Sequence, residues 1–430
     1  MWLTSKSYHM LSRDRSYKFL YLSIAILLAA KTLFSATKSI ILSRWSNFSD
    51  YLYTYSGGFI RRGLTGELLI FLRDTFNIPP LVTAHVISVI GYIVVAWFVI
   101  SRFKKQGYGL YVLIMGFTLG GILIFGIDAM RRDYIELSFF ITIVWAFKKL
   151  STTQWVILSN LVAVLAIMMH EASFFFIVPI CILLTNLKIH NIFKSTVLWL
   201  PALAIFGLCC MKKGDSEMFS QIIATAHSLA PEEIDREAPG LLSFIKTDMV
   251  EVFKIHLKIN FTEPVPHIGI PVGVITVFYF LYIPWITIAM LRAFSTPNIG
   301  NQRLSCLLSL IGFQFVCLTP MFTVLSCDIV RVSLYWIMSA MIVWLVLDDR
   351  EIESMFPTGY IHRVQWLTDK MLALRITRNK VILTFCALCI GVTFYIRQPK
   401  PIIGSSPAGA VAYYANRIAK KAVPLIINKF

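Results

Sequence analysis

Long apolar runs recur from one end of the chain to the other, and they constrain its fold more than any other feature. A run of about 18 apolar residues is long enough to cross a hydrocarbon layer of about 30 Å as a helix. Of the 430 residues, 57% are hydrophobic and only 15% are charged. A soluble multidomain fold would leave most of these runs without a core to enter. The sequence therefore predicts an all-α, polytopic membrane protein.

About eleven transmembrane helices are predicted. They cover 19–42, 81–101, 109–127, 134–148, 154–170, 172–187, 195–211, 269–292, 303–322, 330–348 and 380–396. The run at 19–42 follows a mostly polar segment and lacks a small-residue cleavage site, so it is interpreted as a signal anchor. The whole chain, 1–430, is expected to form a single multi-pass domain. Its larger connections are a first outer loop (43–80), a second large outer loop (212–268) and a cytoplasmic linker (349–379).

The basic residues of alternate loops set the predicted orientation. The N-terminal tail and every second loop carry Lys and Arg, for example Arg102, Lys104 and Lys105, then Lys148 and Lys149. Basic residues accumulate in cytoplasmic loops, so these loops and the N-terminus are expected to be cytoplasmic and the C-terminus outside. The same rule explains the formal net charge of +17. A nucleic-acid partner is therefore not expected.

The cysteines give no sign of a metal site or a disulfide framework. Seven of the eight lie in apolar runs, where Cys usually behaves as a small hydrophobic residue. A C-x-x-C at Cys386 and Cys389 falls inside a predicted membrane helix, where a redox role is not favoured. Neither a metal nor a cofactor is expected.

Positive charge also occurs on the predicted outer side, where it is least expected. Arg61 and Arg62 follow Gly57 and Gly58 in "YSGGFIRRGL". The other outer loops contain "GIDAMRRDYIEL", "IMMHEASFFF" and "LSCDIVRVS". Their polar residues, each at or just inside the end of an apolar run, are Asp128, Arg131, Arg132, Asp133, Glu136, His170, Glu171, Asp328 and Arg331. Ionisable residues at such depth are costly unless they face a cavity or one another, so one shared polar cavity is predicted.

The residue types in these clusters favour an anionic ligand. Five arginines are available for phosphate oxygens, which guanidinium groups bind in a bidentate fork: Arg61, Arg62, Arg131, Arg132 and Arg331. Gly57 and Gly58 would let the backbone approach a ligand closely. Asp50, Asp128, Asp133, Glu171 or His170 could take a proton from a sugar hydroxyl as general base, and Asp328 is expected in a supporting position. A lipid phosphate or diphosphate that carries sugar fits such a cavity.

Structural interpretations of the same residues remain open. Arg61 and Arg62 could anchor the chain to outer-leaflet phosphates, and "DAMRRD" could be an internal salt-bridge cluster. His170 with Glu171 and Asp328 with Arg331 could be pairs that only stabilise helix ends. Asp50 could be a helix cap.

The layout resembles the multi-spanning glycosyltransferases of GT-C architecture. In that family an acidic residue lies in the first outer loop, a surface helix follows it, and further acidic residues lie in the second outer loop. Asp50 matches the first position, "LTGELLIFLRDTF" (64–76) the surface helix, and Asp128 or Asp133 the second acidic position. "GGFIRRGL", "DAMRRDY" and "HEASFFF" are similar to motifs of O-antigen and capsule polymerases and of serotype-converting glycosyltransferases. The paired-acid motif of oligosaccharyltransferases is absent, so a metal-free mechanism is favoured.

The resemblance implies a glycosyltransferase that uses a polyprenyl-linked saccharide at the outer face of a bacterial inner membrane, with membrane lipid and other polysaccharide-assembly proteins as partners. A repeat-unit polymerase of O-antigen or capsule is favoured. A side-branch transferase that uses a polyprenyl-phosphate sugar is the first alternative. A flippase or other transporter, a structural membrane protein and an acyltransferase are further alternatives, although the one-sided charge and the lack of repeats argue against a transporter.

Overall fold

The protein is described here from a computed structural model of the whole chain, in which residues 48–115, 118, 132–212, 214–231, 247, 249–262, 272–295, 298–326 and 329–389 are placed well enough to describe. Within those ranges every regular element is a helix, and no strand occurs. The all-α prediction is confirmed for this part of the chain. The predicted span 19–42 lies outside the described residues.

The first outer segment folds into two short elements that lead into a long helix. A 3₁₀ turn, η1 (Phe48–Tyr51), is followed by α2 (Gly63–Phe76), which coincides with the surface helix expected at 64–76. Asn77, in a left-handed conformation, ends α2. The next helix, α3 (Pro80–Gln106), begins with proline, which is tolerated in the first helical turn because its missing N–H has no intrahelical partner there.

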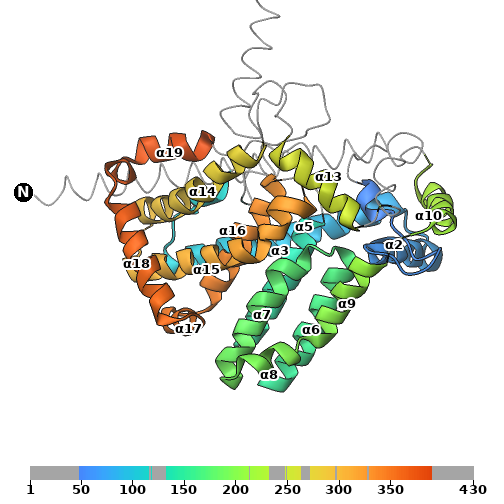
Figure 1. Cartoon of the computed structure of the whole chain (residues 1–430), viewed down its shortest axis with the longest axis horizontal. Coiled ribbons are helices and arrows are strands. Elements are labelled where there is room, and N and C mark those ends of the chain that lie inside the picture. Colours follow the sequence, from blue (N-terminus) through green and yellow to red (C-terminus); the bar gives the residue numbers. More distant parts are fainter. Residues whose placement is uncertain are drawn as a thin grey trace, which may run out of the picture.

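Five described helices follow, of which α8 is the shortest. They are α5 (Asp133–Phe147), α6 (Thr152–Met169), α7 (Ser173–Ile189), α8 (Ile192–Val197) and α9 (Leu200–Met211). A capping box of Ser151 and Gln154 starts α6. Helix α6 packs against α5, α7 and α9, and Figure 1 shows α6, α7 and α9 side by side, with α8 at their far end.

The C-terminal half adds a second group of helices. It contains α14 (Val272–Phe294), α15 (Asn301–Pro320), the π turn η4 (Met321–Leu325) and α16 (Ile329–Val346), then α17 (Asp349–Ser354), α18 (Thr358–Ala373), η5 (Arg375–Arg378) and α19 (Lys380–Cys389). Helix α16 packs on α5, α7 and α15 and so joins the two groups. One continuous apolar core runs through both groups.

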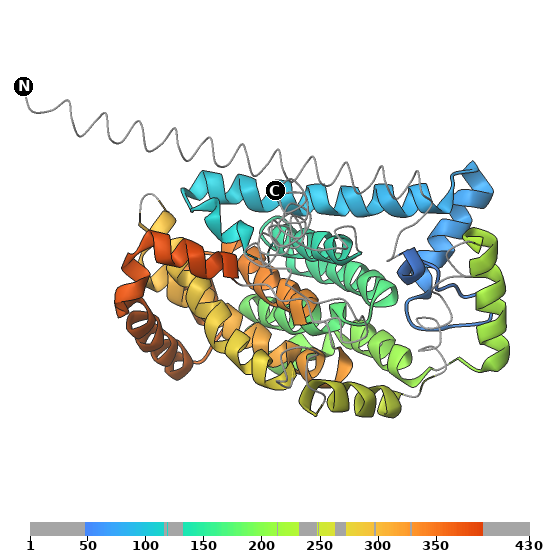
Figure 2. The ribbon, with the colours of Figure 1, turned by 90° about the horizontal axis from the view of Figure 1, so that it is seen from above.

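Two helices come from the large loop predicted at 212–268. Helix α13 (Met249–Phe261) lies in the second half of this loop and packs on η4 and α14. Helix α10 (Ser216–Leu229) is capped by Asp215, and it buries Ile222, Ala226 and Leu229 against a smaller core formed by η1, α2 and the start of α3. In both overall views α2 and α10 lie at one end of the molecule, and α18 lies at the other (Figures 1 and 2).

Three described helical segments are long and apolar enough to cross a membrane: Pro80–Gln106, Thr152–Met169 and Asn301–Leu325. Shorter apolar helices occupy Ser173–Ile189, Leu200–Met211, Phe280–Phe294 and Arg331–Val346. These segments fit a membrane protein, whereas the number of eleven spans and the sides of the two termini stay predictions.

Two predicted spans differ from the observed helices. The span at 195–211 is broken between α8 and α9, where Trp199 precedes the new helix and Pro201 lies in its first turn. Proline cannot donate the hydrogen bond that would continue the first helix. The span at 109–127 begins as a 3₁₀ turn, η2 (Leu110–Ile114), and most of its remainder lies outside the described residues. Within the linker predicted at 349–379, α17 and α18 are well-formed helices.

The loops rich in basic residues meet at one end of the helices. Lys148, just after α5, pairs with Glu351 of α17, and Lys188 of α7 donates to the carbonyl of Leu150 at 3.0 Å. Arg303 at the start of α15 pairs with Asp349 at 2.7 Å. These contacts bring together loops that the sequence assigns to the cytoplasmic side.

Candidate functional site

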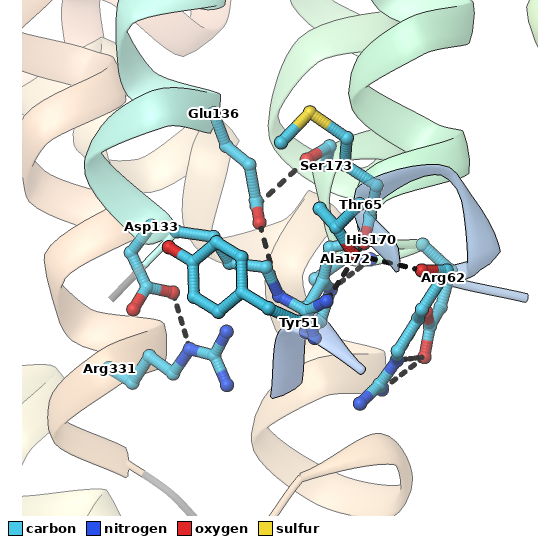
Figure 3. Close-up of polar contacts among 12 residues, drawn as sticks. Tyr51, Arg62, Thr65, Asp133, Glu136, His170, Ala172, Ser173 and Arg331 are labelled. Atoms are coloured by element: carbon cyan, nitrogen blue, oxygen red, sulfur yellow. Dashed lines mark hydrogen bonds and ion pairs between the residues drawn. The ribbon is translucent and has the colours of Figure 1, made fainter. Parts of the chain in front are cut away.

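The opposite ends of the same helices bring together charged side chains that are far apart in the sequence. Helix α5 begins there, α6 ends there, and α7 and α16 begin there (Figure 3). We call this group the arginine–carboxylate cluster. It consists of Arg62, Arg132, Asp133, Glu136, His170, Glu171, Ser173, Arg331 and Tyr335. Described residues of all four outer-side motifs predicted to line one site therefore do meet.

Arg62 forms a bidentate ion pair with Glu171. Its Nε lies 3.1 Å from Oε1 and 2.8 Å from Oε2 of Glu171, and its Nη2 also donates to Oε1. Arg62 stands directly before α2 with φ of 69°, a left-handed conformation that is uncommon for a side chain of this size. The pair joins the first outer segment to the junction of α6 and α7. It therefore fixes where α2 begins relative to the bundle.

Arg132 is completely buried beside the end of α6. Its Nη1 donates to the carbonyl of Met169 at 3.0 Å, and its Nε lies 3.9 Å from Oε1 of Glu136. The carbonyls in the last turn of a helix lack partners within the helix and carry the negative end of its dipole. A guanidinium group at this point satisfies one of them and stabilises the end of α6.

Asp133 and Glu136 share one tyrosine of α16. The hydroxyl of Tyr335 lies 2.9 Å from Oε2 of Glu136 and also contacts Oδ1 of Asp133. Arg331, one turn earlier on α16, donates through Nε to the same Asp133 oxygen, and Ser173 donates to Oε2 of Glu136 at 2.8 Å. All of these side chains except Arg331 are buried or nearly so. The first turns of α5, α7 and α16 are thus tied together by polar contacts.

His170 is held as a neutral ring. Burial, together with Arg62 and Arg132, keeps the pKa of His170 well below its usual 6.5. Its Nδ1 accepts the backbone N–H of Ala172 at 3.0 Å, so in the neutral ring Nε2 carries the proton. This tautomer makes His170 a hydrogen-bond donor at Nε2 and not a general base.

Glu171 is held as a carboxylate. Burial alone would raise its pKa, but the guanidinium groups of Arg62 and Arg61 outweigh that effect and keep the pKa well below the usual 4.5. Both of its oxygens accept from Arg62. Glu171 therefore fits the role of a partner that orients an arginine better than that of a proton acceptor.

The glycines of "YSGGF" lie against another helix. The N–H of Gly58 donates to the carbonyl of Tyr55 at 2.8 Å, and Gly58 has φ of 120°, which favours glycine. A Cβ on Gly57 would lie 2.7 Å from Cα of Met218. These glycines therefore pack closely against α10. The sequence analysis had instead expected a ligand to lie beside them. Arg61 follows them, half-buried and near enough to Glu171 to act on its charge.

Several predicted site residues cannot be placed in the cluster. Asp128, Arg131 and Asp328 lie outside the described residues. Asp50 belongs to η1, and nothing is described of its side chain. Among the described residues, no three His, Cys, Asp or Glu side chains gather in a way that could hold a metal ion.

Tyr335 and Ser173 were missed by sequence reasoning, and Glu136 was noticed only as a polar neighbour. Each carries a weak signal: Tyr335 is four residues after Arg331, and Glu136 is three after Asp133, spacings that place side chains on one helix face. Ser173 starts a helix just after the His-Glu pair. A tyrosine or serine among apolar residues gives no sign by itself that it contacts a carboxylate on another helix.

No known protein family, curated protein or solved structure matches the chain.

Proposed function

We propose that this protein is a membrane glycosyltransferase that takes sugar from a polyprenyl phosphate or diphosphate at the outer face of a bacterial inner membrane. Within that class we propose a repeat-unit polymerase of O-antigen or capsule. One observation carries the proposal: Arg62, Arg132 and Arg331, from three distant segments, lie in one cluster with carboxylates at the end of the helices opposite the lysine-rich loops.

The arginines suit a phosphate leaving group. Transfer of sugar from a polyprenyl diphosphate breaks the bond between the sugar and the phosphate, and the negative charge on the departing phosphate must be stabilised. Arg62 and Arg331 are already oriented by Glu171 and Asp133, so little side-chain entropy would be lost when phosphate oxygens approach them. His170 would add a neutral donor at Nε2.

A carboxylate of the cluster would take the proton of the acceptor hydroxyl. Asp133 is the best placed of the sequence-predicted candidates, because Glu171 is committed to Arg62 and His170 has its proton on Nε2. Asp133 keeps Oδ2 for a further contact, since Arg331 and Tyr335 both use Oδ1. A general base must reach the hydroxyl directly or through one water.

A surface-glycan gel tests this function. A strain that lacks the gene is compared with strains that express the wild type, Arg62→Ala, or Arg73→Ala as a matched control on α2, the helix that Arg62 precedes, where Arg73 pairs with exposed Asp74. We expect the deletion to reduce the glycan ladder to single repeat units, the wild type and Arg73→Ala to restore it, and Arg62→Ala to fail. A ladder of normal length with altered mass per repeat would indicate a side-branch transferase instead. An unchanged glycan in every strain would exclude both.

A further inference from the structure

The hydroxyl group of Tyr335 lies between two carboxyl groups but has only one hydrogen. It is within hydrogen-bonding distance of Oε2 of Glu136, at 2.9 Å, and of Oδ1 of Asp133. A hydroxyl donates one hydrogen bond and accepts others. If Tyr335 donates to one carboxyl group, the contact with the other is favourable only when that group carries a proton and donates to the tyrosine oxygen.

The neighbours of the two carboxyl groups differ, and they identify which one carries the proton. Asp133 receives the Nε–H of Arg331 on the same oxygen that contacts Tyr335, so it is the ionised member. Glu136 receives no such hydrogen bond from the described arginines. Nε of Arg132 is 3.9 Å from Oε1 of Glu136, beyond hydrogen-bonding distance, while Nη1 of Arg132 donates to the carbonyl of Met169.

Burial acts in the same direction. Glu136 is completely buried, and its Oε1 accepts no hydrogen bond from the described residues. An ionised carboxylate without strong donors on one oxygen is costly in such a place, whereas the neutral acid is not. Protonated Oε2 can donate to Tyr335 while it still accepts from Ser173.

We propose that Glu136 is a neutral acid that holds a proton for the cluster, and that this proton adapts the site to a doubly negative phosphate or diphosphate group. With Glu136 neutral, the cluster carries one negative charge fewer than it would with Asp133, Glu136 and Glu171 all ionised, so it attracts a doubly negative group more strongly. The ligand class rests on the proposed function, whereas the protonation of Glu136 does not.

The groups that could change this balance lie on each element that packs near Glu136. The titratable and charged ones are Arg132 and Asp133 on α5, Arg331 and Tyr335 on α16, His170 and Glu171 between α6 and α7, Arg62 before α2, and His85 and Tyr92 on α3. Of these, Asp133 and Glu171 already have arginine partners and His170 is neutral. Among the described carboxyl groups of the cluster, Glu136 is therefore the one left to gain or lose a proton.

Infrared spectroscopy of the purified full-length protein in lipid bilayers tests the protonation state. A carboxylic acid has a C=O stretching band that a carboxylate lacks. At neutral pH we expect such a band in the wild type, its complete loss in Glu136→Gln, and its retention in Glu353→Gln, a control at the opposite end of the helices. In Tyr335→Phe the band should remain but shift, because its hydrogen-bond partner is gone. The proposal would be overturned if the wild-type spectrum had no carboxylic acid band, or if the band persisted in Glu136→Gln.

A titration of the wild type alone serves as a second readout that needs no variant. The band should disappear as the pH is raised well above neutral. Its absence already at neutral pH would contradict a neutral Glu136, whatever the stability of the variants.

Sulfate binding tests the ligand class, since sulfate stays doubly negative over this pH range. The affinity of each protein for sulfate at high pH is compared with its own value at neutral pH. As the pH is raised, the wild type should lose affinity by about tenfold or more, because an ionised Glu136 lies next to the bound charge, and Glu136→Gln should not. If both proteins lost sulfate affinity to the same extent as the pH was raised, the role of Glu136 in anion binding would be overturned. None of these measurements uses a sugar substrate, so their failure is distinguishable from failure of the proposed transferase activity.

Discussion

At the scale of single residues, the cluster depends on side chains whose shape matters as much as their charge. Arg62 contacts both oxygens of Glu171, a geometry that lysine cannot reproduce because its ammonium group is a point charge. Arg132 reaches a backbone carbonyl, and Arg331 is oriented toward one oxygen of Asp133. Each contact connects two helices, so a change at one residue is expected to affect the position of another.

Arg62→Lys should therefore impair both stability and function although it conserves charge. We expect a loss of about 1–3 kcal/mol in the free energy of unfolding, because one charge-assisted hydrogen bond is lost and Glu171 is left partly unsatisfied. The readouts are thermal unfolding in detergent and the length of the surface glycan. Arg73→Lys on the same helix should change neither. Wild-type stability and glycan length in Arg62→Lys would show that the bidentate contact is dispensable.

His170 should make stability fall in mildly acidic solution. Its pKa in the folded protein is lowered by burial and by Arg62 and Arg132, whereas the unfolded chain has the ordinary value of 6.5. Below that value the unfolded state binds a proton that the folded state does not, so stability decreases as the pH is lowered from about 6.5 to about 5. Glu171, whose folded pKa lies well below 4.5, contributes its own loss only as the pH falls from about its unfolded value of 4.5 toward more acidic conditions.

The check is the melting temperature as a function of pH. His170→Asn keeps a side-chain acceptor for the N–H of Ala172 but does not titrate, so its curve should be flatter between pH about 6.5 and about 5. His362→Asn, at an exposed position on α18, should retain the wild-type slope. Identical curves for wild type and His170→Asn would contradict the buried, neutral state of His170.

At the scale of elements, α2 is the part that carries the first arginines to the bundle. Its buried side includes Gly66, and its start is fixed by Arg62. The packing of α2 is close because Gly66 lies against the backbone of the segment that precedes the helix: a Cβ there would lie 2.0 Å from the carbonyl oxygen of Tyr53. The N–H of Gly66 also donates to that oxygen at 3.1 Å.

Gly66→Ala should therefore displace α2. We expect destabilisation by about 1–3 kcal/mol, because backbone atoms that cannot rotate away must move to admit the methyl group. Arg62 would move with the helix, so glycan length should also fall. Gly359→Ala is the matched control, since its Cβ would meet nothing within 4 Å, and it should be neutral or slightly stabilising by about 0.5–1 kcal/mol. A stable, active Gly66→Ala protein would show that α2 has room to shift.

Most helices of the described part were predictable, because long apolar runs leave little choice of structure. The expected spans at 134–148, 154–170 and 172–187 match α5, α6 and α7 within a few residues. The break between α8 and α9 was not predicted, although Pro201 was a visible signal. Helix α10 was not predicted either, since its apolar side is short and its partners come from segments far earlier in the sequence.

The convergence of the polar motifs followed from placing them on one side, but their pairings did not. Arg62, Asp133, Glu171 and Arg331 were predicted to share one site because each lies near the end of an apolar run on the same predicted side of the membrane. Which carboxylate pairs with which arginine depends on how α5, α7 and α16 pack, and the sequence contains no local signal for that packing. The role of Tyr335 was hidden for the same reason.

At the scale of the whole molecule, the two ends of the bundle differ in charge pairing and should face different compartments. Ser56 is exposed near the cluster, and Ser354 is exposed on α17 at the other end. In intact cells, Ser56→Cys should react with a membrane-impermeant thiol reagent, and Ser354→Cys should react only after the membrane is permeabilised. Labelling is measured relative to the unsubstituted chain, which carries eight native cysteines. The reverse labelling pattern would show that the cluster faces the cytoplasm, and it would exclude a transferase at the outer face.

The most direct measurement is sugar transfer by the purified protein. Lipid-linked saccharide that accumulates in the deletion strain is reconstituted with the protein in liposomes, and the length of the lipid-linked glycan is followed. Wild-type protein should lengthen the glycan and release polyprenyl diphosphate, while Arg331→Lys should do so at least about tenfold more slowly, since it loses the guanidinium contact with Asp133. Failure of the wild type to lengthen a substrate that wild-type membranes do lengthen would contradict the proposed polymerase.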